Sequence, residues 1–289
     1  AATLGKWLRL DERGRNLAVL CGMSALFTAL FGTPLGATVF SLEVVSVGIL
    51  HYSAFFPALF SALVSLGVTH LMGLSPTNWP LLGVPELTPL SLLQVGVLGA
   101  GCGLVAILFC TAMHYTADRY RRLLPNPYLR ILVGAGLVIA LTLVEGSGDY
   151  NGAGSAFLTA TLAGEAAAPW AFLFKIAFTA LTLGAGFRGG EIVPTFFIGS
   201  AFGNALAPLL GLEPAFGAAI GLIALFCGVV NCPLASIFLS VELFGSSGLL
   251  FFALACALSY LLSGKFSLYS SQKIVYSKLE PRYIDQLAE

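Results

Sequence analysis

The sequence predicts an all-α polytopic membrane protein, built as an inverted repeat with broken helices that span only half of the bilayer. Three observations predict this class. Of the 289 residues, 57% are hydrophobic and only 10% are charged, and the mean hydropathy of +0.91 is far above that of a soluble domain. Apolar stretches recur at lengths near the roughly 20 residues that a spanning helix needs. Finally, two segments of the chain align with each other without a gap, and each contains a short predicted helix that begins at a proline.

The apolar stretches are the candidate spans, and glycine and proline interrupt several of them. They lie near residues 16–32, 49–73, 91–116, 129–145, 170–186, 194–211, 214–230 and 247–263. Some are too short for a full crossing, which predicts helices that end inside the protein.

The composition also excludes several classes of protein. The 14 basic and 14 acidic residues cancel, so no net charge draws the chain to nucleic acid. The six cysteines lack CxxC or CxxxC spacing, which argues against a disulfide framework or a zinc site. His51, His70 and His114 lie on separate segments, and we expect them at helix ends or membrane interfaces. We therefore expect no enzyme, no catalytic residue, no cofactor, no metal and no nucleic-acid partner.

Basic residues predict the orientation in the lipid bilayer. They cluster at Lys6, Arg9, Arg13 and Arg15, at Arg119, Arg121, Arg122 and Arg130, and at Lys265, Lys273, Lys278 and Arg282. The loops at 74–88 and 146–168 contain no Lys or Arg, so the positive-inside rule places these loops outside and the C-terminus in the cytoplasm. We expect an integral protein of a bacterial inner membrane.

The last segment, residues 265–289, mixes apolar and charged residues at helical spacing. Its apolar residues are Leu268, Ile274, Val275 and Leu279. This pattern predicts an amphipathic helix at the cytoplasmic face, with Ser267 as the candidate N-cap.

An internal repeat is the most specific feature of the chain. Residues 22–43 align with residues 221–242 at an offset of 199, and eight of the 22 positions are identical. The identical positions are Gly22/Gly221, Ala25/Ala224, Leu26/Leu225, Phe27/Phe226, Pro34/Pro233, Leu35/Leu234, Ser41/Ser240 and Glu43/Glu242. The apolar bias of the chain accounts for the Ala, Leu and Phe matches better than for the aligned Pro and Glu.

Each copy of the repeat reads as a helix that stops before proline, followed by a short helix of about ten residues ending in glutamate. Ten residues rise about 15 Å, half of the roughly 30 Å hydrocarbon core. Paired half-helices indicate an inverted-repeat transporter with its site near the midplane. The alternative is two proline-kinked helices that share composition. We divide the single membrane domain into residues 1–145, the remainder of the first repeat, and residues 146–289, the second repeat with its C-terminal helix.

A glycine-rich stretch, GAGFRGGEIVPTFFIGSAFG at 184–203, precedes a helix that should open near Pro194. Glycine lets the backbone approach a ligand closely, and the positive end of the helix dipole lies at this point. The pattern indicates an anion site made of main chain, without a fixed positive charge that would hold a small anion too tightly. A glycine-rich hinge between two helices is the alternative.

Five charged residues lie in or near predicted spans, where charge is costly. Arg188 and Glu191 are three residues apart, and for Arg188 we expect a structural ion pair between them. Glu191, beside the anion site, could donate a hydrogen bond to an anion when protonated, or be neutralised by the helix end when ionised. Lys175 should pair or snorkel, with a transport role as the minority reading. We expect Glu43 and Glu242 to form hydrogen bonds with neighbouring backbone. A structural role is favoured over a role in proton coupling.

These residues resemble a known family. The stretch GGEIVPTFFIGSAFG at 189–203 resembles the anion-binding motif of CLC chloride channels and transporters. The segments 32–44 and 231–243 look like the paired half-helices of that family, and LYSS at 268–271 matches the segment with its inner-gate tyrosine. The resemblance implies a CLC-like inverted repeat that lacks the N-terminal part of the family's membrane domain, including its gating glutamate and an earlier anion loop.

The resemblance also implies a site and partners. The expected anion-binding residues are Gly189, Gly190, Glu191, Ile192, Val193, Pro194 and Tyr269. The amides of Ile192 and Val193 would line the site, and Tyr269 would offer its hydroxyl from the cytoplasmic side. The implied partners are fluoride or chloride ions, protons and a second copy of the chain, which would contact the half-helices after Pro34 and Pro233.

Departures from the family pattern select a branch. Ile192 replaces the phenylalanine of the usual motif, and Glu191 before it resembles the fluoride/proton antiporters. Val44 stands where chloride/proton exchangers carry a second carboxylate. We therefore expect proton-coupled fluoride export. The alternatives are a voltage-gated-type chloride channel or chloride/proton exchanger, and a truncated membrane fragment that does not conduct.

Overall fold

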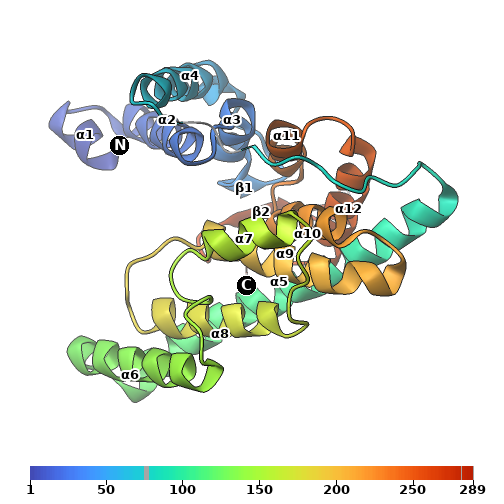
Figure 1. The fold of residues 1–289 in the computed structure, drawn as a ribbon. Coiled ribbons are helices and arrows are strands. Elements are labelled where there is room, and N and C mark those ends of the chain that lie inside the picture. The colour runs from blue at the N-terminus through green and yellow to red at the C-terminus, as the bar shows by residue number, and fades with distance from the viewer. Residues whose placement is uncertain (75–77, 281, 289) are drawn as a thin grey trace. The chain divides into compact units, whose positions relative to one another are not determined.

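The computed structural model describes residues 1–74, 78–280 and 282–288, and most of them are helical (Figure 1). The α-helices are α1 (Ala2–Trp7), α2 (Glu12–Phe31), α3 (Pro34–Glu43), α4 (Phe55–Leu71), α5 (Pro89–Leu123), α6 (Pro127–Glu145), α7 (Ser155–Leu162), α8 (Ala171–Gly184), α9 (Ile192–Leu206), α10 (Pro214–Val230), α11 (Pro233–Phe244) and α12 (Leu249–Leu262). The 3₁₀ helices are η1 (Tyr52–Ala54) and η2 (Ala207–Leu210), and the strands are β1 (Ser46–Val47), β2 (Lys273–Tyr276) and β3 (Tyr283–Leu287).

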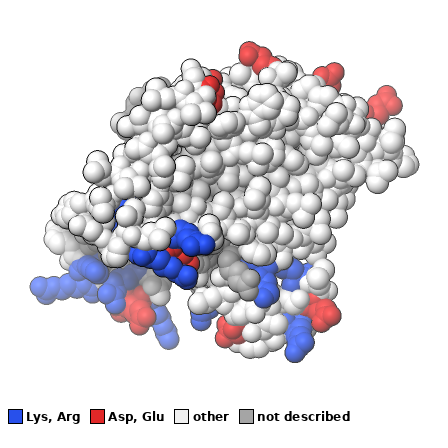
Figure 2. Space-filling model, turned by 90° about the horizontal axis from the view of Figure 1, so that it is seen from below, with Lys and Arg blue, Asp and Glu red and all other residues white. Residues whose placement is uncertain are grey.

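Each predicted apolar span corresponds to a helix, so the prediction of a helical membrane protein is confirmed. Among the described residues, five helical stretches are long and apolar enough to cross a bilayer: α2, η1 with α4, α5, α6, and α9 with η2. Within α6 only Gly134 is buried, so this apolar helix exposes nearly all of its side chains. Figure 2 shows a face on which wide areas carry no charged side chain. Such surfaces require lipid as their solvent.

The chain forms two compact units. Unit 1 comprises residues 1–80, 231–249 and 271–288, and unit 2 comprises residues 81–230 and 250–270. Unit 1 takes a half-helix from each copy of the repeat, so this division does not follow residue 145, and the boundary there stays a prediction. Residues 75–77 of the predicted 74–88 loop, and residues 281 and 289, lie outside the described residues.

In unit 1, α2 packs along α4 and α3 packs against α11 (Figure 1). The first helix stops at Gly32, whose φ of 71° closes the helix end, and α3 restarts at Pro34 with ten residues. The second break lies at Asn231, also in the left-handed region with φ of 58°, before α11 with twelve residues. Both helices are too short to cross the bilayer, so the half-span prediction is confirmed.

The predicted C-terminal amphipathic helix is wrong, because the segment forms two strands. β2 pairs in parallel with β1 and antiparallel with β3. Ile274 and Val275 are adjacent, β-branched and both buried, which suits a strand packed on two sides. Leu279, expected on the same helical face, is 79% exposed. Ser267 caps no helix, and its hydroxyl accepts the amide of Tyr269 in a turn instead.

Unit 2 is organised by the close antiparallel contact of α9 with α10. Gly199 and Gly203 face Gly217 and Gly221, and a Cβ added at Gly203 would lie 2.0 Å from the Gly217 carbonyl oxygen. This small-residue spacing on both helices lets their backbones touch, as in other membrane helix pairs. The long helix α5 packs against α10 and α8, so α9 is held with its N-terminus beside α8.

Candidate anion-binding site

The candidate site begins where α8 ends. Residues 185–190 are not helical, and α9 begins at Ile192 with Pro194 in its first turn, as predicted. The guanidinium of Arg130 donates its Nε–H to Ala185 O at 3.1 Å, which satisfies a carbonyl at the end of α8.

The first turn of α9 leaves two main-chain donors unused. The amide of Thr195 donates to Glu191 O at 3.1 Å and closes the turn. The amides of Ile192 and Val193 donate to no described residue, and Pro194 has no N–H. These two N–H groups lie at the positive end of the helix dipole, so together they can bind an anion without a charged side chain.

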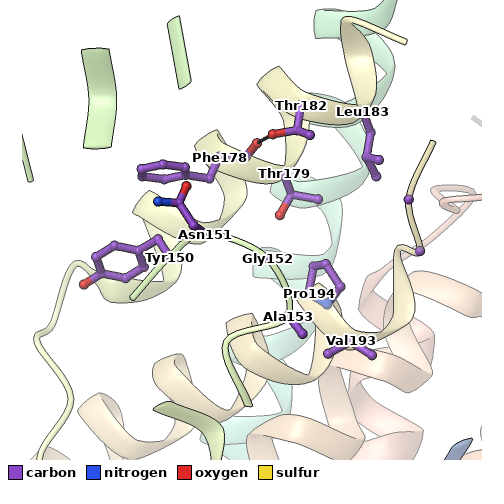
Figure 3. A pocket seen from close by; sticks show the side chains of 12 residues that line it. Tyr150, Asn151, Gly152, Ala153, Phe178, Thr179, Thr182, Leu183, Val193 and Pro194 are labelled. Atoms are coloured by element: carbon purple, nitrogen blue, oxygen red, sulfur yellow. Dashed lines mark hydrogen bonds between the residues drawn. The ribbon is translucent and has the colours of Figure 1, made fainter. Parts of the chain in front are cut away.

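A cavity of about 310 Å³ adjoins this helix start. Its lining comes from the α6–α7 loop, from α8, from the non-helical segment after α8 and from the beginning of α9: Tyr150, Asn151, Gly152, Ala153, Phe178, Thr179, Thr182, Leu183, Gly189, Gly190, Val193 and Pro194. In Figure 3, Phe178 and Thr179 project from α8, while Pro194 and Val193 lie on α9 beyond the loop through Gly152 and Ala153. A Cβ added at Gly190 would meet no atom within 4 Å, so the backbone there is open to a ligand.

Glu191 is half-buried at the helix start; its main-chain carbonyl accepts from Thr195, but its carboxyl group makes no hydrogen bond with a described residue. The prediction of an ion pair between Arg188 and Glu191 is wrong, because these two described residues form none. Arg188 is exposed, and because residues 188–190 are not helical, a three-residue separation does not bring the two side chains together.

His114, expected at a helix end or a membrane interface, makes a polar contact within unit 2. Its Nε2 lies 2.8 Å from Ser267 O, and Ser267 Oγ accepts the amide of Tyr269 at 3.1 Å. Within unit 2, His114 therefore contacts the turn that carries Tyr269. The available signal was its place near the end of a long apolar helix, which reads equally as an interface histidine. The anion-binding roles of Glu191 and Tyr269 stay predictions.

Lys175 pairs inside the protein, in agreement with one of the two expectations for it. The side chain is 1% exposed, and Nζ donates to Tyr150 O at 3.0 Å and to Gly152 O at 2.8 Å. Nζ also lies 4.7 Å from the centroid of the Phe197 ring. Lys175 therefore fixes the loop that forms one wall of the cavity.

Glu43 and Glu242 bond to backbone, as expected, but each does so on the opposite half-helix. The Glu43 carboxylate accepts the amides of Leu234 at 3.2 Å and Ala235 at 2.9 Å, in the first turn of α11. The Glu242 carboxylate accepts the amides of Leu35 at 2.8 Å and Gly36 at 2.7 Å, in the first turn of α3. The two copies of the repeat thus cap each other at equivalent positions.

The start of α9 offers two main-chain donors and the carboxyl group of Glu191, and the adjoining cavity is lined by the polar side chains of Asn151, Thr179 and Thr182. Among the described residues, no group of three or more His, Cys, Asp or Glu side chains could hold a metal ion. The arrangement suits reversible binding of a small anion and transfer of a proton.

Comparison with known proteins gives consistent matches. Residues 1–264 match the family described as voltage gated chloride channel. The chain is 38% identical over 279 residues to a chloride/fluoride channel protein of Pseudomonas syringae pv. tomato, covering 93% of this chain and 61% of the relative. It is 30% identical over 176 residues to the H(+)/Cl(−) exchange transporter ClcA of Vibrio cholerae serotype O1, covering 57% of this chain and 37% of that protein.

A solved structure matches as well. The fold is similar to the crystal structure of a CLC-type fluoride/proton antiporter, with a TM-score of 0.89, 34% identity, and coverage of 93% of this chain and 68% of that one. The chain spans about three fifths of the length of the Pseudomonas relative.

Proposed function

The chain belongs to the voltage-gated chloride channel family, known as CLC, and we propose that it carries the anion site of a proton-coupled fluoride exporter. The observation that carries the proposal is the start of α9, where the unused amides of Ile192 and Val193 directly follow Glu191, whose carboxyl group caps no amide. Similarity to a fluoride/proton antiporter and to a chloride/fluoride channel protein supports the same choice.

The chemistry of fluoride favours this site. Fluoride is the smallest halide and the strongest hydrogen-bond acceptor among them, so its dehydration must be offset by strong donors. The two amides supply part of the hydrogen bonding that offsets dehydration. A protonated Glu191 supplies an O–H donor, whose hydrogen bond is stronger when the anion is a better acceptor. Because the donors are dipoles and a neutral acid, the anion can still be released.

The other site residues have complementary roles in the proposal. Gly189 and Gly190 line the cavity, and Gly190 leaves the backbone accessible there. Tyr269 offers its hydroxyl to the anion from the cytoplasmic side. Glu43 and Glu242 hold the half-helices together, and Arg188 has no described partner that would assign it a transport role.

We further propose that the protein works as a homodimer in a bacterial inner membrane, with its C-terminus in the cytoplasm. The half-helices α3 and α11 expose apolar side chains that suit a partner copy: Leu35 is 45% exposed, Leu234 is 44% exposed and Phe238 is 43% exposed. Leu35 and Leu234 occupy equivalent positions of the repeat.

Flux measurements in liposomes test the function. The protein, expressed from its complete coding sequence, is reconstituted with internal fluoride or chloride, and anion efflux and proton uptake are recorded together. We expect fluoride efflux coupled to proton uptake. Glu191→Ala removes the acid donor and should reduce the preference for fluoride over chloride by roughly tenfold or more, the loss typical of a hydrogen bond to a charged group. Glu86→Ala, at an exposed position, is the matched control.

Two outcomes would contradict the proposal. Absence of flux of both anions from the wild-type protein would overturn transport. A preference for chloride that Glu191→Ala leaves unchanged would assign the protein to the chloride channels or chloride/proton exchangers instead.

A further inference from the structure

The α8 wall of the cavity offers no hydrogen-bond donor to an anion. Thr179 donates its hydroxyl to Lys175 O at 2.8 Å, and Thr182 donates to Phe178 O at 2.7 Å, each one turn back along the helix (Figure 3). A hydroxyl group has a single hydrogen to donate, so both threonines present only oxygen lone pairs to the cavity. Donors to an anion must therefore come from the start of α9 and from the α6–α7 loop.

In the α6–α7 loop, Lys175 fixes the direction of two carbonyl groups. Its ammonium group donates to Tyr150 O at 3.0 Å and to Gly152 O at 2.8 Å. Tyr150 and Gly152 line the cavity, whereas Lys175 does not and is 1% exposed. The two carbonyl oxygens are therefore turned into the protein, toward the buried ammonium group.

A peptide group whose carbonyl is held in place also has a fixed N–H. Among the described residues no peptide bond is cis, so the N–H of Ala153 points away from the Gly152 carbonyl, and thus away from Lys175. The Ala153 amide donates to no described residue, and Ala153 lines the same cavity as Val193. The loop therefore carries a main-chain donor that is both oriented and unused.

The direction of this peptide group depends on the lysine, because the residue before it is a glycine. Gly152 has a φ of 58°, and a Cβ added there would meet no atom within 4 Å. A glycine in open space can rotate its carbonyl with little steric cost. Without the ammonium group, the Gly152 carbonyl is free to turn toward the cavity, where its partial negative charge would repel an anion.

Lys175 also brings a positive charge that no described acid cancels. The ammonium group contacts the two carbonyl oxygens and the ring of Phe197, and it forms no ion pair with a described residue. One layer of peptide groups separates this charge from the cavity. The charge therefore attracts an anion without touching it, which leaves the anion free to depart.

From these contacts we propose that Lys175 is a positioning residue for the transported anion, an inference that rests on the proposed function. Lys175 holds the Gly152 carbonyl inside the protein, so that the Ala153 N–H is presented to the anion. This amide adds a donor from the α6–α7 loop to the main-chain donors at the start of α9. The ammonium charge strengthens binding from behind the cavity wall.

Replacing the Ala153 amide with an ester tests the donor by itself. L-lactic acid at position 153 removes one N–H and keeps the side chain. We use the protein expressed from its complete coding sequence and measure sodium fluoride binding by titration calorimetry in detergent. We expect the dissociation constant to rise by about tenfold, as for the loss of a hydrogen bond to a charged group. The half-saturating fluoride concentration for efflux from liposomes should rise in parallel.

Glycolic acid at position 154 is the matched control for the ester. The Gly154 amide also donates to no described residue, but Gly154 does not line the cavity. Fluoride binding should therefore stay at the wild-type value.

Lys175→Met tests whether the lysine acts through the Ala153 amide. Alone, this substitution should weaken fluoride binding at least as much as the ester, because both the orientation of the amide and the charge are lost. Combined with the ester, it should weaken binding little further, because the amide no longer faces the anion. A role in stability alone predicts that folded Lys175→Met binds fluoride like the wild type.

Unchanged fluoride binding by the protein with the ester at position 153 would overturn the proposal. Additive effects of the ester and Lys175→Met would overturn it as well, since they would show that the two groups act independently. If Lys175→Met does not fold, the ester alone decides. A wild-type protein that neither binds nor moves fluoride would instead overturn the proposed function.

Discussion

At the scale of single residues, Lys175 shows how an isolated charge is accommodated within the protein. An ammonium group buried without a carboxylate is costly, and the protein offsets that cost with two carbonyl oxygens and the face of Phe197. The carbonyls belong to Tyr150 and Gly152, which also line the cavity. The same contacts that stabilise the charge therefore shape the wall opposite the start of α9.

Replacing Lys175 with methionine tests this coupling of stability and shape. Lys175→Met keeps the length of the side chain but removes the donor to the buried Tyr150 carbonyl and to the partly buried Gly152 carbonyl, so we expect a loss of about 2 kcal/mol in unfolding free energy. The melting temperature in detergent should fall, and amide exchange at residues 150–154 should speed up. Lys6→Met, at an exposed site, is the control. An unchanged melting temperature and unchanged amide exchange rates would show that Lys175 does not stabilise the α6–α7 loop.

At the scale of elements, the reciprocal caps explain why each half-helix ends near glutamate. A carboxylate at the C-terminal end of its own helix is unfavourable, because the dipole is negative there. In unit 1 this carboxylate reaches the N-terminal end of the other half-helix, where the dipole is positive and two amides are unpaired. Each short helix supplies the charge that the other lacks, so the pair is stable only as a pair.

Removing either of the two glutamate caps should lower the unfolding free energy by a similar amount. A glutamine can accept through one oxygen only, so Glu43→Gln and Glu242→Gln should each lower the unfolding free energy by about 1–2 kcal/mol. Thermal unfolding in detergent, with Glu86→Gln as the control, gives the comparison. Strong destabilisation by one substitution and none by the other would contradict the mutual cap.

At the scale of the whole molecule, the distribution of charge along the chain decides its orientation in the membrane. The loop between α6 and α7 has no basic residue, whereas the turn between α5 and α6 is flanked by Arg121, Arg122 and Arg130. Because α6 is an apolar helix of 19 residues that buries only Gly134, we expect it to cross the bilayer between these two loops.

Cysteine labelling tests this orientation. Asp149→Cys, in the α6–α7 loop, should react in intact cells with a maleimide that does not cross membranes. Leu123→Cys, 71% exposed at the end of α5, should react only after the cells are opened. The unsubstituted protein reports the background from the half-buried Cys21. Labelling of Leu123→Cys in intact cells would reverse the proposed topology.

Local pattern alone determined much of this protein. Hydropathy fixed its solvent as lipid, Pro34 and Pro233 marked the two restarts, and the glycines before Pro194 marked the open helix start, because each of these features acts within a few residues of itself. The tertiary structure decided the rest. Glu43 reaches amides more than 190 residues away, and His114 reaches the Ser267 carbonyl 153 residues away. The C-terminal segment becomes a strand because β1 offers it an edge. Such contacts depend on which distant elements the fold brings together, and that is set by packing.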